Sequence, residues 1–246
     1  MPSLSHLCLQ HLRAGISALI PSSCALCGQA GDVLLCVDCR QQFIKKDVAR
    51  CNQCAIPLAK HDDHLICGEC LSSRPSFDCT VVASDYSAPI DQLVLALKFG
   101  HRLALSTLFS ELLRDAALRD SEQHLPEILC AVPLGQQRLC DRGFNQSLEI
   151  AKLLASHLGI QLDPELIRRN RETVQQSSLH PDDRQKNVRN AFAPSQHAID
   201  LIKDKHIGVV DDVMTTGTTL HEIATVLKRF GAAKVTNYVF ARTPRH

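Results

Sequence analysis

Four Cys-x-x-Cys pairs crowd into the stretch between positions 24 and 70, and they limit what this chain can fold into more than any other feature. The pairs are Cys24/Cys27, Cys36/Cys39, Cys51/Cys54 and Cys67/Cys70. Two thiolates three positions apart can hold one tetrahedral metal ion, and a second such pair completes a shell of four. Because so short a segment cannot build a hydrophobic core, we expect bound zinc to replace that core.

Eight ligands make two zinc sites, and the simplest grouping follows the chain. It puts Cys24, Cys27, Cys36 and Cys39 on one ion and Cys51, Cys54, Cys67 and Cys70 on the other. An interleaved grouping stays open, as do a redox dithiol and an iron–sulfur cluster. Four thiolates leave no open position for a substrate, so we expect both sites to be structural.

Other residues of this segment have ordinary interpretations. Gly28 and Gly68 stand beside ligand cysteines, where a tight turn would require a positive φ. We expect His61 and His64 to be solvated loop residues, because the thiolates suffice. The unpaired cysteines are interpreted as small buried hydrophobic residues; they are Cys8, Cys79, Cys130 and Cys140.

Composition gives no global hint of a partner. The formal net charge is +1, and aromatic residues make up 4% with no Trp, which argues against a base-stacking platform. Residues 1–20 have an amphipathic helical pattern, for packing on the next module or for binding a membrane surface or partner. No secretory signal or membrane span is expected, so we place the protein in the cytoplasm, with peripheral attachment to the inner membrane through a partner as an option.

After Cys70 the pattern changes to alternating strands and helices. Strand-like runs cover 78–86, 127–133, 206–212 and 234–242, and amphipathic helical runs cover 89–100, 104–120, 144–159 and 219–232. This alternation predicts an α/β fold, with a parallel sheet flanked by helices. The polar segment 168–189 carries six Lys/Arg against three Asp/Glu and no apolar period. It is either a solvated insertion or a flap over an anionic ligand.

The stretch "IGVVDDVMTTGTTLHEIA" predicts a ligand site. Asp211 and Asp212 come at the end of a buried strand, where open α/β sheets bind ligands. The turn that follows offers hydroxyls and the free N–H groups of a helix N-terminus to an anion. Thr219 with Glu222 fits a capping box, which places the helix start near Thr219. Carboxylates for ribose hydroxyls beside donors for a phosphate predict a binder of ribose 5-phosphate.

This stretch resembles the phosphoribosyl pyrophosphate (PRPP) motif of type I phosphoribosyltransferases. Further stretches are similar to the ComF/GntX family, in which a double zinc ribbon precedes a phosphoribosyltransferase domain. They include "CALCG", "LICGEC", "ALKFGHR", "VPLGQQRLCDRGFNQ" and "RRNRETVQQSSLHPDDRQKNVRNAF". The resemblance spans roughly residues 21–242. It implies a zinc-ribbon module at 21–75 and a phosphoribosyltransferase-like domain at 76–246, with a flexible hood at about 165–192. The amphipathic helix expected from the pattern of residues 1–20 precedes them.

The resemblance also assigns residues. Asp211 and Asp212 would bind the ribose hydroxyls, and the 5-phosphate would be held by Thr215, Thr216, Gly217, Thr218 and Thr219. Residues 133–138 correspond to the pyrophosphate loop. Candidates for the pyrophosphate and the hood are Lys98, Gln136, Arg138, Arg142, Gln176 and Arg184. The family usually has a glycine in a Y-x-G pattern at this strand end and an Arg in the next helix. Here Tyr86 is followed by Ser87 and Ala88, and Asp91 and Gln92 stand where the Arg is common.

Two functions from different classes remain. The first is a Mg²⁺-dependent phosphoribosyltransferase, whose work is to position PRPP, neutralise the leaving pyrophosphate and exclude water. The second is a PRPP-binding protein without transfer, whose zinc ribbons contact single-stranded DNA or protein. The family resemblance implies a role in natural competence and in the use of external DNA, with competence-machinery proteins as partners. The residues do not identify an acceptor.

Overall fold

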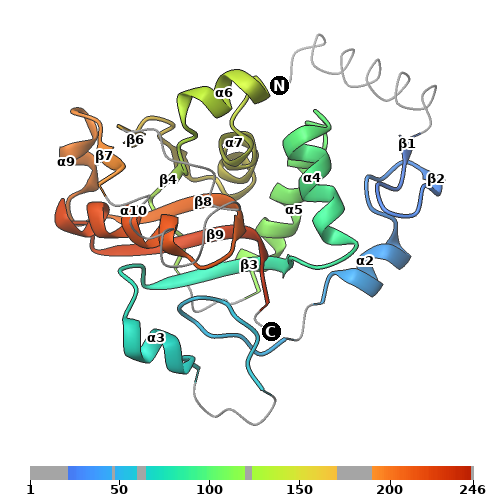
Figure 1. The fold of residues 1–246 in the computed structure, drawn as a ribbon, viewed down its shortest axis with the longest axis horizontal. Coiled ribbons are helices and arrows are strands. Elements are labelled where there is room, and N and C mark those ends of the chain that lie inside the picture. The colour runs from blue at the N-terminus through green and yellow to red at the C-terminus, as the bar shows by residue number, and fades with distance from the viewer. Residues whose placement is uncertain (1–21, 46–47, 60–64, 120–123, 171–189, 245–246) are drawn as a thin grey trace, which may run out of the picture. The chain divides into compact units, whose positions relative to one another are not determined.

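The computed structural model describes residues 22–45, 48–59, 65–119, 124–170 and 190–244 (Figure 1). Contacts divide the chain into two compact units, residues 1–45 and 46–246. This division separates the two cysteine clusters, since the pairs at 24–39 fall in the first unit and the pairs at 51–70 in the second. The domain limits expected from the sequence stay predictions, and the helix expected at 1–20 lies outside the described residues.

The first unit is built around its cysteines. Strands β1 (Ser22–Ser23) and β2 (Ala30–Gly31) form a short antiparallel hairpin, and helix α2 (Val37–Phe43) follows. Its buried hydrophobic residues within the described part are few, namely Cys24, Leu35, Cys39 and Ile44. So small a core agrees with the expectation that metal ligation, more than apolar burial, holds this unit together.

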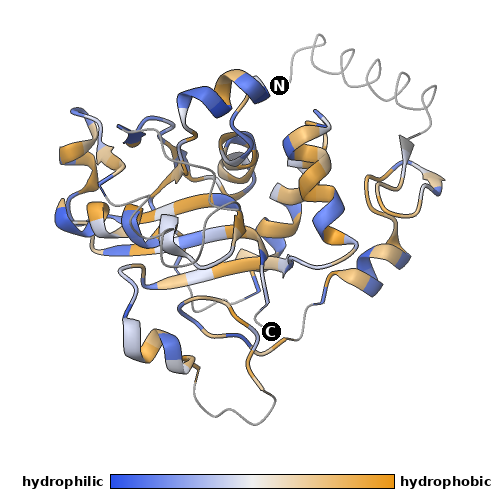
Figure 2. Cartoon of the chain, viewed as in Figure 1, coloured by the Kyte–Doolittle hydropathy of each residue, from blue (hydrophilic) through white to orange (hydrophobic). Residues whose placement is uncertain are grey.

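The second unit contains the parallel sheet that the sequence predicts. Its five strands lie in the order β3-β9-β8-β4-β5, and every neighbouring pair is parallel. The strands are β3 (Cys79–Asp85), β4 (Ile128–Ala131), β5 (Gln161–Leu162), β8 (His206–Met214) and β9 (Lys234–Arg242). The α/β prediction is therefore confirmed, and hydrophobic residues colour much of these strands in Figure 2.

Helices cover both faces of this sheet. On one face lie α4 (Ile90–Phe99), α5 (Leu105–Ala117) and α7 (Gln146–Leu158). There the ring of Phe109 stacks on Phe240 with centroids 3.5 Å apart. On the other face α10 (Thr218–Arg229) shares a buried core with Val235 and Val239. Because neighbouring strand residues point to opposite faces, Val239 and Phe240 serve the two layers in turn.

Several elements were not expected. Helix α6 (Gln136–Arg142) takes up residues 136–138 of the segment expected to be the pyrophosphate loop, because only residues 132–135 separate it from β4. Strands β6 (Ile167–Arg169) and β7 (Phe192–Pro194) form an antiparallel pair, with helix α9 (Ala198–Ile202) after them and helix α3 (Gly68–Ser73) in the second cysteine segment. Most of the predicted hood, residues 171–189, lies outside the described part.

Candidate functional site: two cysteine clusters and a cleft lined by acids and cations

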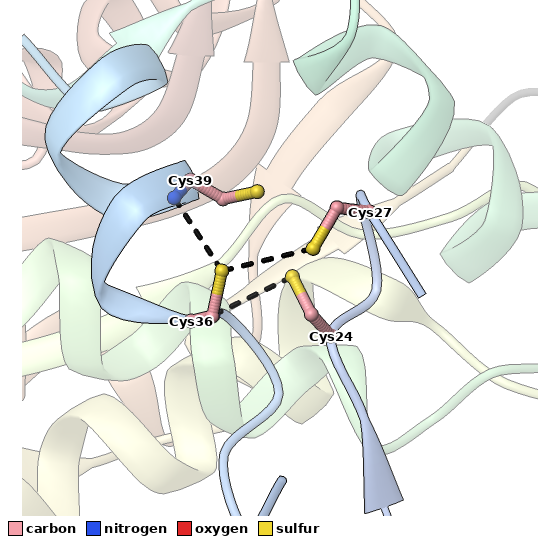
Figure 3. A group of neighbouring side chains, drawn as sticks. All are labelled: Cys24, Cys27, Cys36 and Cys39. Atoms are coloured by element: carbon pink, nitrogen blue, oxygen red, sulfur yellow. Dashed lines mark hydrogen bonds between the residues drawn. The ribbon is translucent and has the colours of Figure 1, made fainter. Parts of the chain in front are cut away.

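The first cluster joins a turn to the start of a helix. Cys24 and Cys27 lie on the turn between β1 and β2, while Cys36 caps α2 and Cys39 lies in its first turn (Figure 3). The four sulfur atoms all lie within 4.8 Å of one another. The backbone N–H of Cys36 donates to Cys24 Sγ at 3.4 Å.

The second cluster repeats this construction. Cys51 and Cys54 lie on a turn, Cys67 precedes α3 and Cys70 is inside it, again with the sulfurs within 4.8 Å. The N–H of Cys67 donates to Cys51 Sγ at 3.3 Å, the counterpart of the contact to Cys24. The grouping along the chain is thus the one that the structure has, and neither His61 nor His64 is within the described residues.

Both clusters fit a divalent cation. Burial opposes ionisation of Cys24 and Cys51, but backbone N–H groups outweigh it and lower the pKa of Cys24 to about 6 and of Cys51 to about 7. Burial and the neighbouring sulfurs raise the pKa of Cys39 and Cys70 far above the usual range. Four crowded thiols therefore ionise together only when a cation neutralises them, which is what tetrahedral Zn²⁺ does.

One of the two glycine predictions is wrong. Gly28 has a φ of 75°, as a turn after the second ligand requires. Gly68 has no positive φ, because it is the first residue of α3. The position that matches Gly28 in the second cluster is Ala55, which has a φ of 57°. The turn is conserved between the clusters, but its glycine is not.

The second cluster is hydrogen-bonded to the sheet. The backbone carbonyl of Asn52 accepts from Thr80 N at 3.1 Å, and that of Gln53 accepts from Thr80 Oγ1 at 2.6 Å. The carbonyl of Cys54 accepts from Arg242 Nε at 2.9 Å. Three successive carbonyls of this turn are therefore held by β3 and β9.

The predicted ligand site lies at the carboxyl ends of β4 and β8, where a cavity of about 360 Å³ opens. Asp211 and Asp212 line it, although β8 continues to Met214, so the two acids stand inside the strand and not after it. Ser147 Oγ donates to Asp211 Oδ1 at 2.9 Å. Lys98 Nζ pairs with Asp212 Oδ2 at 2.9 Å, which supplies the cation that a buried carboxylate requires.

The two aspartates do not ionise alike. Burial raises the pKa of Asp211 to about 7, and the charge of Asp212 adds to the effect. Lys98 and the hydroxyl of Ser147 act in the opposite direction but do not cancel it. The free cleft thus holds a carboxyl group that loses its proton near neutral pH. A bound cation or a hydroxyl-rich ligand would favour the charged form of this group.

The threonine turn forms the N-terminal end of α10. The helix begins at Thr218 and its N-cap is Gly217, with a φ of 81° and no side-chain cap. The predicted capping box is therefore wrong in its register, because Thr219 already lies inside the helix. The hydroxyls of Thr216 and Thr218 lie 2.7 Å apart. Thr215 and Thr219 line the cavity, while Thr216, Gly217 and Thr218 do not.

The "RGFN" motif has a local explanation. Gly143, with a φ of 76°, ends α6, and Asn145 caps α7 by accepting from Ser147 N at 3.1 Å. Asn145 Nδ2 also donates to the carbonyl of Val132 at the end of β4. This cap places Ser147 beneath Asp211. Sequence reasoning missed Ser147, and the preference of Asn for helix caps is the pattern that would have indicated it.

Cations surround the acids. Of the predicted pyrophosphate residues, Lys98, Arg138 and Arg142 line the cavity, together with Arg169, which the sequence did not single out. Arg142 lies 5.0 Å from the ring centroid of Phe99 and donates to Gln146 Oε1 at 3.0 Å, so its direction is fixed. Gln136 starts α6 but does not line the cavity. Gln176 and Arg184 lie outside the described residues.

No helix among the described residues is both long enough and apolar enough to span a bilayer. Two family models match the chain: a double zinc ribbon domain at residues 15–71 and a phosphoribosyl transferase domain at residues 145–246. The structure also aligns with a glutamine PRPP amidotransferase of B. subtilis at 19% identity, covering 56% of this chain and 26% of that one, with a TM-score of 0.37.

Curated relatives match over most of their length. The DNA utilization protein YhgH of Escherichia coli (strain K12) is 36% identical over 231 residues, which cover 91% of this chain and 98% of that protein. Competence protein F of Haemophilus influenzae is 32% identical over 214 residues, or 85% and 90% of the two chains. Identity at this level over most of both chains, together with a double zinc ribbon model ahead of a phosphoribosyl transferase model in this chain, shows that the protein belongs to the ComF/GntX family.

Proposed function

We propose that the cleft at the carboxyl ends of β4 and β8 binds PRPP together with Mg²⁺. The observation that carries the proposal is the convergence of opposite charges on one cavity. Two adjacent aspartates stand on β8, the turn before α10 offers hydroxyls and free N–H groups, and four cationic side chains line the same space. Carboxylates suit ribose hydroxyls, and cations with a helix N-terminus suit phosphates.

The assigned residues divide the ligand among them. Asp211 and Asp212 hold the ribose hydroxyls, and residues 215–219 hold the 5-phosphate. Arg138 and Arg142 stand near residues 133–135, where the pyrophosphate group would lie. Lys98 now neutralises Asp212 and is available to the pyrophosphate once a metal ion approaches the acids. Bound Mg²⁺ would neutralise charge on the pyrophosphate and the ribose oxygens.

This binding site supports phosphoribosyl transfer as the activity. Transfer needs charge stabilisation and exclusion of water more than a side-chain nucleophile, and the cleft offers four cations and no thiol or amine suited to covalent catalysis among the residues that line it, apart from the paired Lys98. The acceptor is not defined by these residues. The second candidate is PRPP binding without transfer, used to regulate the zinc-ribbon segment.

The relatives named for DNA utilization and competence support a role in the handling of DNA. In this proposal the first unit contacts single-stranded DNA or a competence protein, with Arg40 and Lys45 among its described cations. So thin a basic set predicts weak and salt-sensitive contact with DNA. A cytoplasmic location, with or without a partner at the inner membrane, is part of the proposal.

Titration calorimetry with PRPP in magnesium buffer tests the binding site. We expect saturable binding, and at a hundredfold excess over Kd a stabilisation of about 2.7 kcal/mol. Asp211→Asn with Asp212→Asn should abolish both, because the ribose hydroxyls lose their carboxylates. Asp200→Asn, an exposed acid on α9, is the matched control and should bind normally. Absence of binding to the parent protein would refute the proposal.

Two further measurements separate the candidates. Release of pyrophosphate in the presence of a panel of bases should occur if the protein is a transferase and not if it only binds PRPP. Gel-shift titration with single-stranded DNA at two salt concentrations should show an affinity that falls steeply with salt if the first unit binds DNA.

A further inference from the structure

Arg242 joins the second cysteine cluster to the phosphate-binding turn. Its side chain, 1% exposed, stands at the end of β9. Nε donates to the carbonyl of Cys54 at 2.9 Å, and Nη1 donates to the carbonyl of Met214 at 3.0 Å and to that of Thr215. One rigid guanidinium therefore contacts both a ligand turn and the residues that lead into Gly217.

A second connection runs through the segment that follows α3. Gln53 Nε2, on the ligand turn, donates to the carbonyls of Pro75 and Phe77 at 3.0 and 2.9 Å. The N–H of Ser76 then donates to His221 Nδ1 at 3.0 Å, in the second turn of α10. A methyl group placed on Gly217 would lie 3.7 Å from the ring of Phe77, so this ring lies next to the turn.

The charge of Arg242 is a further link between this residue and the second cluster. Among the ion pairs of the described residues, none joins a carboxylate to Arg242, and a guanidinium this deeply buried requires an anion. The groups whose negative charge would favour charged Arg242 are the sulfurs of the second cluster, those of Cys54, Cys67 and Cys70. Four thiolates around a divalent cation keep a net negative charge, so the loaded cluster would stabilise the arginine where it stands.

We infer that the second zinc site is a positioning element for the PRPP cleft, and that Arg242 is the positioning residue through which the two are coupled. The inference rests on the proposed function. The cluster touches no ligand. It fixes the backbone of Met214 and Thr215 through Arg242, and so holds the phosphate-binding turn in shape before PRPP arrives. The first cluster belongs to the other unit and has no such role.

Reciprocity makes the inference measurable. If loaded zinc favours the bound form of the turn, bound PRPP must by the same free energy favour retention of zinc. The full chain with Cys24→Ser and Cys27→Ser keeps only the second site, so its zinc release to a colorimetric chelator reports one ion. With PRPP in magnesium buffer we expect the chelator concentration that removes half of this zinc at equilibrium to rise about fivefold or more, within the usual range of coupling.

Matched arginine variants separate coupling from general stabilisation. Arg242→Lys keeps a positive charge, but its single nitrogen cannot take the places of both Nε and Nη1. We therefore expect the rise caused by PRPP to fall below about twofold while calorimetry shows weaker binding. Arg50→Met is the control, because Arg50 Nη1 also bonds to the ligand turn, at the carbonyl of Ala55, but pairs with Asp85 and not with the phosphate-binding turn. It should keep the full rise in chelator concentration.

Hydrogen exchange on the parent protein decides the question if Arg242→Lys does not fold. PRPP should protect the amides of residues 51–56 about tenfold more than those of 160–162 at the other edge of the sheet, since only the former are tied to the turn. Equal protection, or unchanged zinc release while calorimetry shows PRPP binding, would overturn the inference and leave the proposed function standing. Absence of PRPP binding by calorimetry would overturn both.

Discussion

The two cysteine clusters are alike in their local structure and unlike in their surroundings. In both, the N–H of the first ligand bonds to a carbonyl five residues on, as Cys24 does to Gln29 at 2.8 Å and Cys51 to Ile56 at 2.9 Å. In the first cluster Cys27 is exposed and few apolar residues lie nearby. In the second, Cys51, Cys54 and Cys70 belong to the core shared with β8, β9 and α10.

One motif therefore has two structural roles in this chain. In the first unit the metal site holds together a segment too small to fold by apolar burial. In the second unit the same construction is built into a sheet that has its own core, and its turn is bonded to Thr80 and Arg242. Spacing alone indicates the metal site, whereas its role depends on what surrounds it.

Removing each metal site in turn should give the largest difference in stability between the two clusters. For Cys51→Ser with Cys54→Ser we expect the sheet unit to lose about 3 kcal/mol or more, a fall in Tm of roughly 6–12 °C, because ligands and core are lost together. For Cys24→Ser with Cys27→Ser the sheet unit should melt unchanged. Calorimetric scans with zinc counted per chain measure both, and equal effects of the two pairs would remove the distinction.

A glycine from each part of the second unit gives the next largest contrast. Gly217→Ala should cost about 2 kcal/mol, because φ is 81° and the new methyl group would come within 2.6 Å of Met214 Cε. Gly68→Ala, beside the ligand Cys67, should cost little, since nothing lies within 4 Å of its new methyl group. Chemical denaturation compares them, and a larger loss for Gly68→Ala would contradict the assignment of strain to the turn.

Substitutions between the two ligands of a Cys-x-x-Cys pair should also affect the two clusters differently. Gln53 and Leu26 occupy the same position of their Cys-x-x-Cys pairs, but only Gln53 donates to two carbonyls, those of Pro75 and Phe77. Gln53→Leu should therefore cost about 1–1.5 kcal/mol with both zinc ions retained. Leu26 is half-buried and makes no such bonds, so Leu26→Gln should cost less than Gln53→Leu. Zinc loss from Gln53→Leu would show that the glutamine supports the metal site itself.

The sequence predicts this molecule best where chemistry is local. The cysteine spacing, the alternation of strands and helices and the Asp-Asp-x-x-Thr-Thr-Gly pattern depend on neighbours along the chain, and they locate the clusters, the sheet and the acids. Arg242 reaches the phosphate-binding turn only through tertiary packing, so no local pattern marks it. Ser147 and Arg169 are indicated no more closely than by a helix cap at Asn145 and by the basic segment 168–189. Helix α6 was missed because its seven residues bury none of their side chains and leave no apolar period.

The smallest predicted effect is a pH dependence of stability caused by a buried carboxyl group in the cleft. It should be seen only in the unit that contains the second cluster, because Asp211 belongs to that unit. Because burial raises the pKa of Asp211 from 3.8 to about 7, the folded state binds more protons than the unfolded state between these values. Stability should therefore fall as pH rises from about 4 to 7 and stay level above 7.

Asn at position 211 keeps the acceptor for Ser147 but has no charge to bury. We expect Asp211→Asn to stabilise the free protein by about 1 kcal/mol at pH 8 and by nothing at pH 4, since Lys98 and solvent offset part of the burial. Denaturation of the sheet unit across this pH range measures the difference, with Asp200→Asn as the exposed control. A variant that is less stable than the parent at pH 8 would mean that Lys98 compensates the charge fully, and that the cleft is organised around two ionised carboxylates even before a ligand binds.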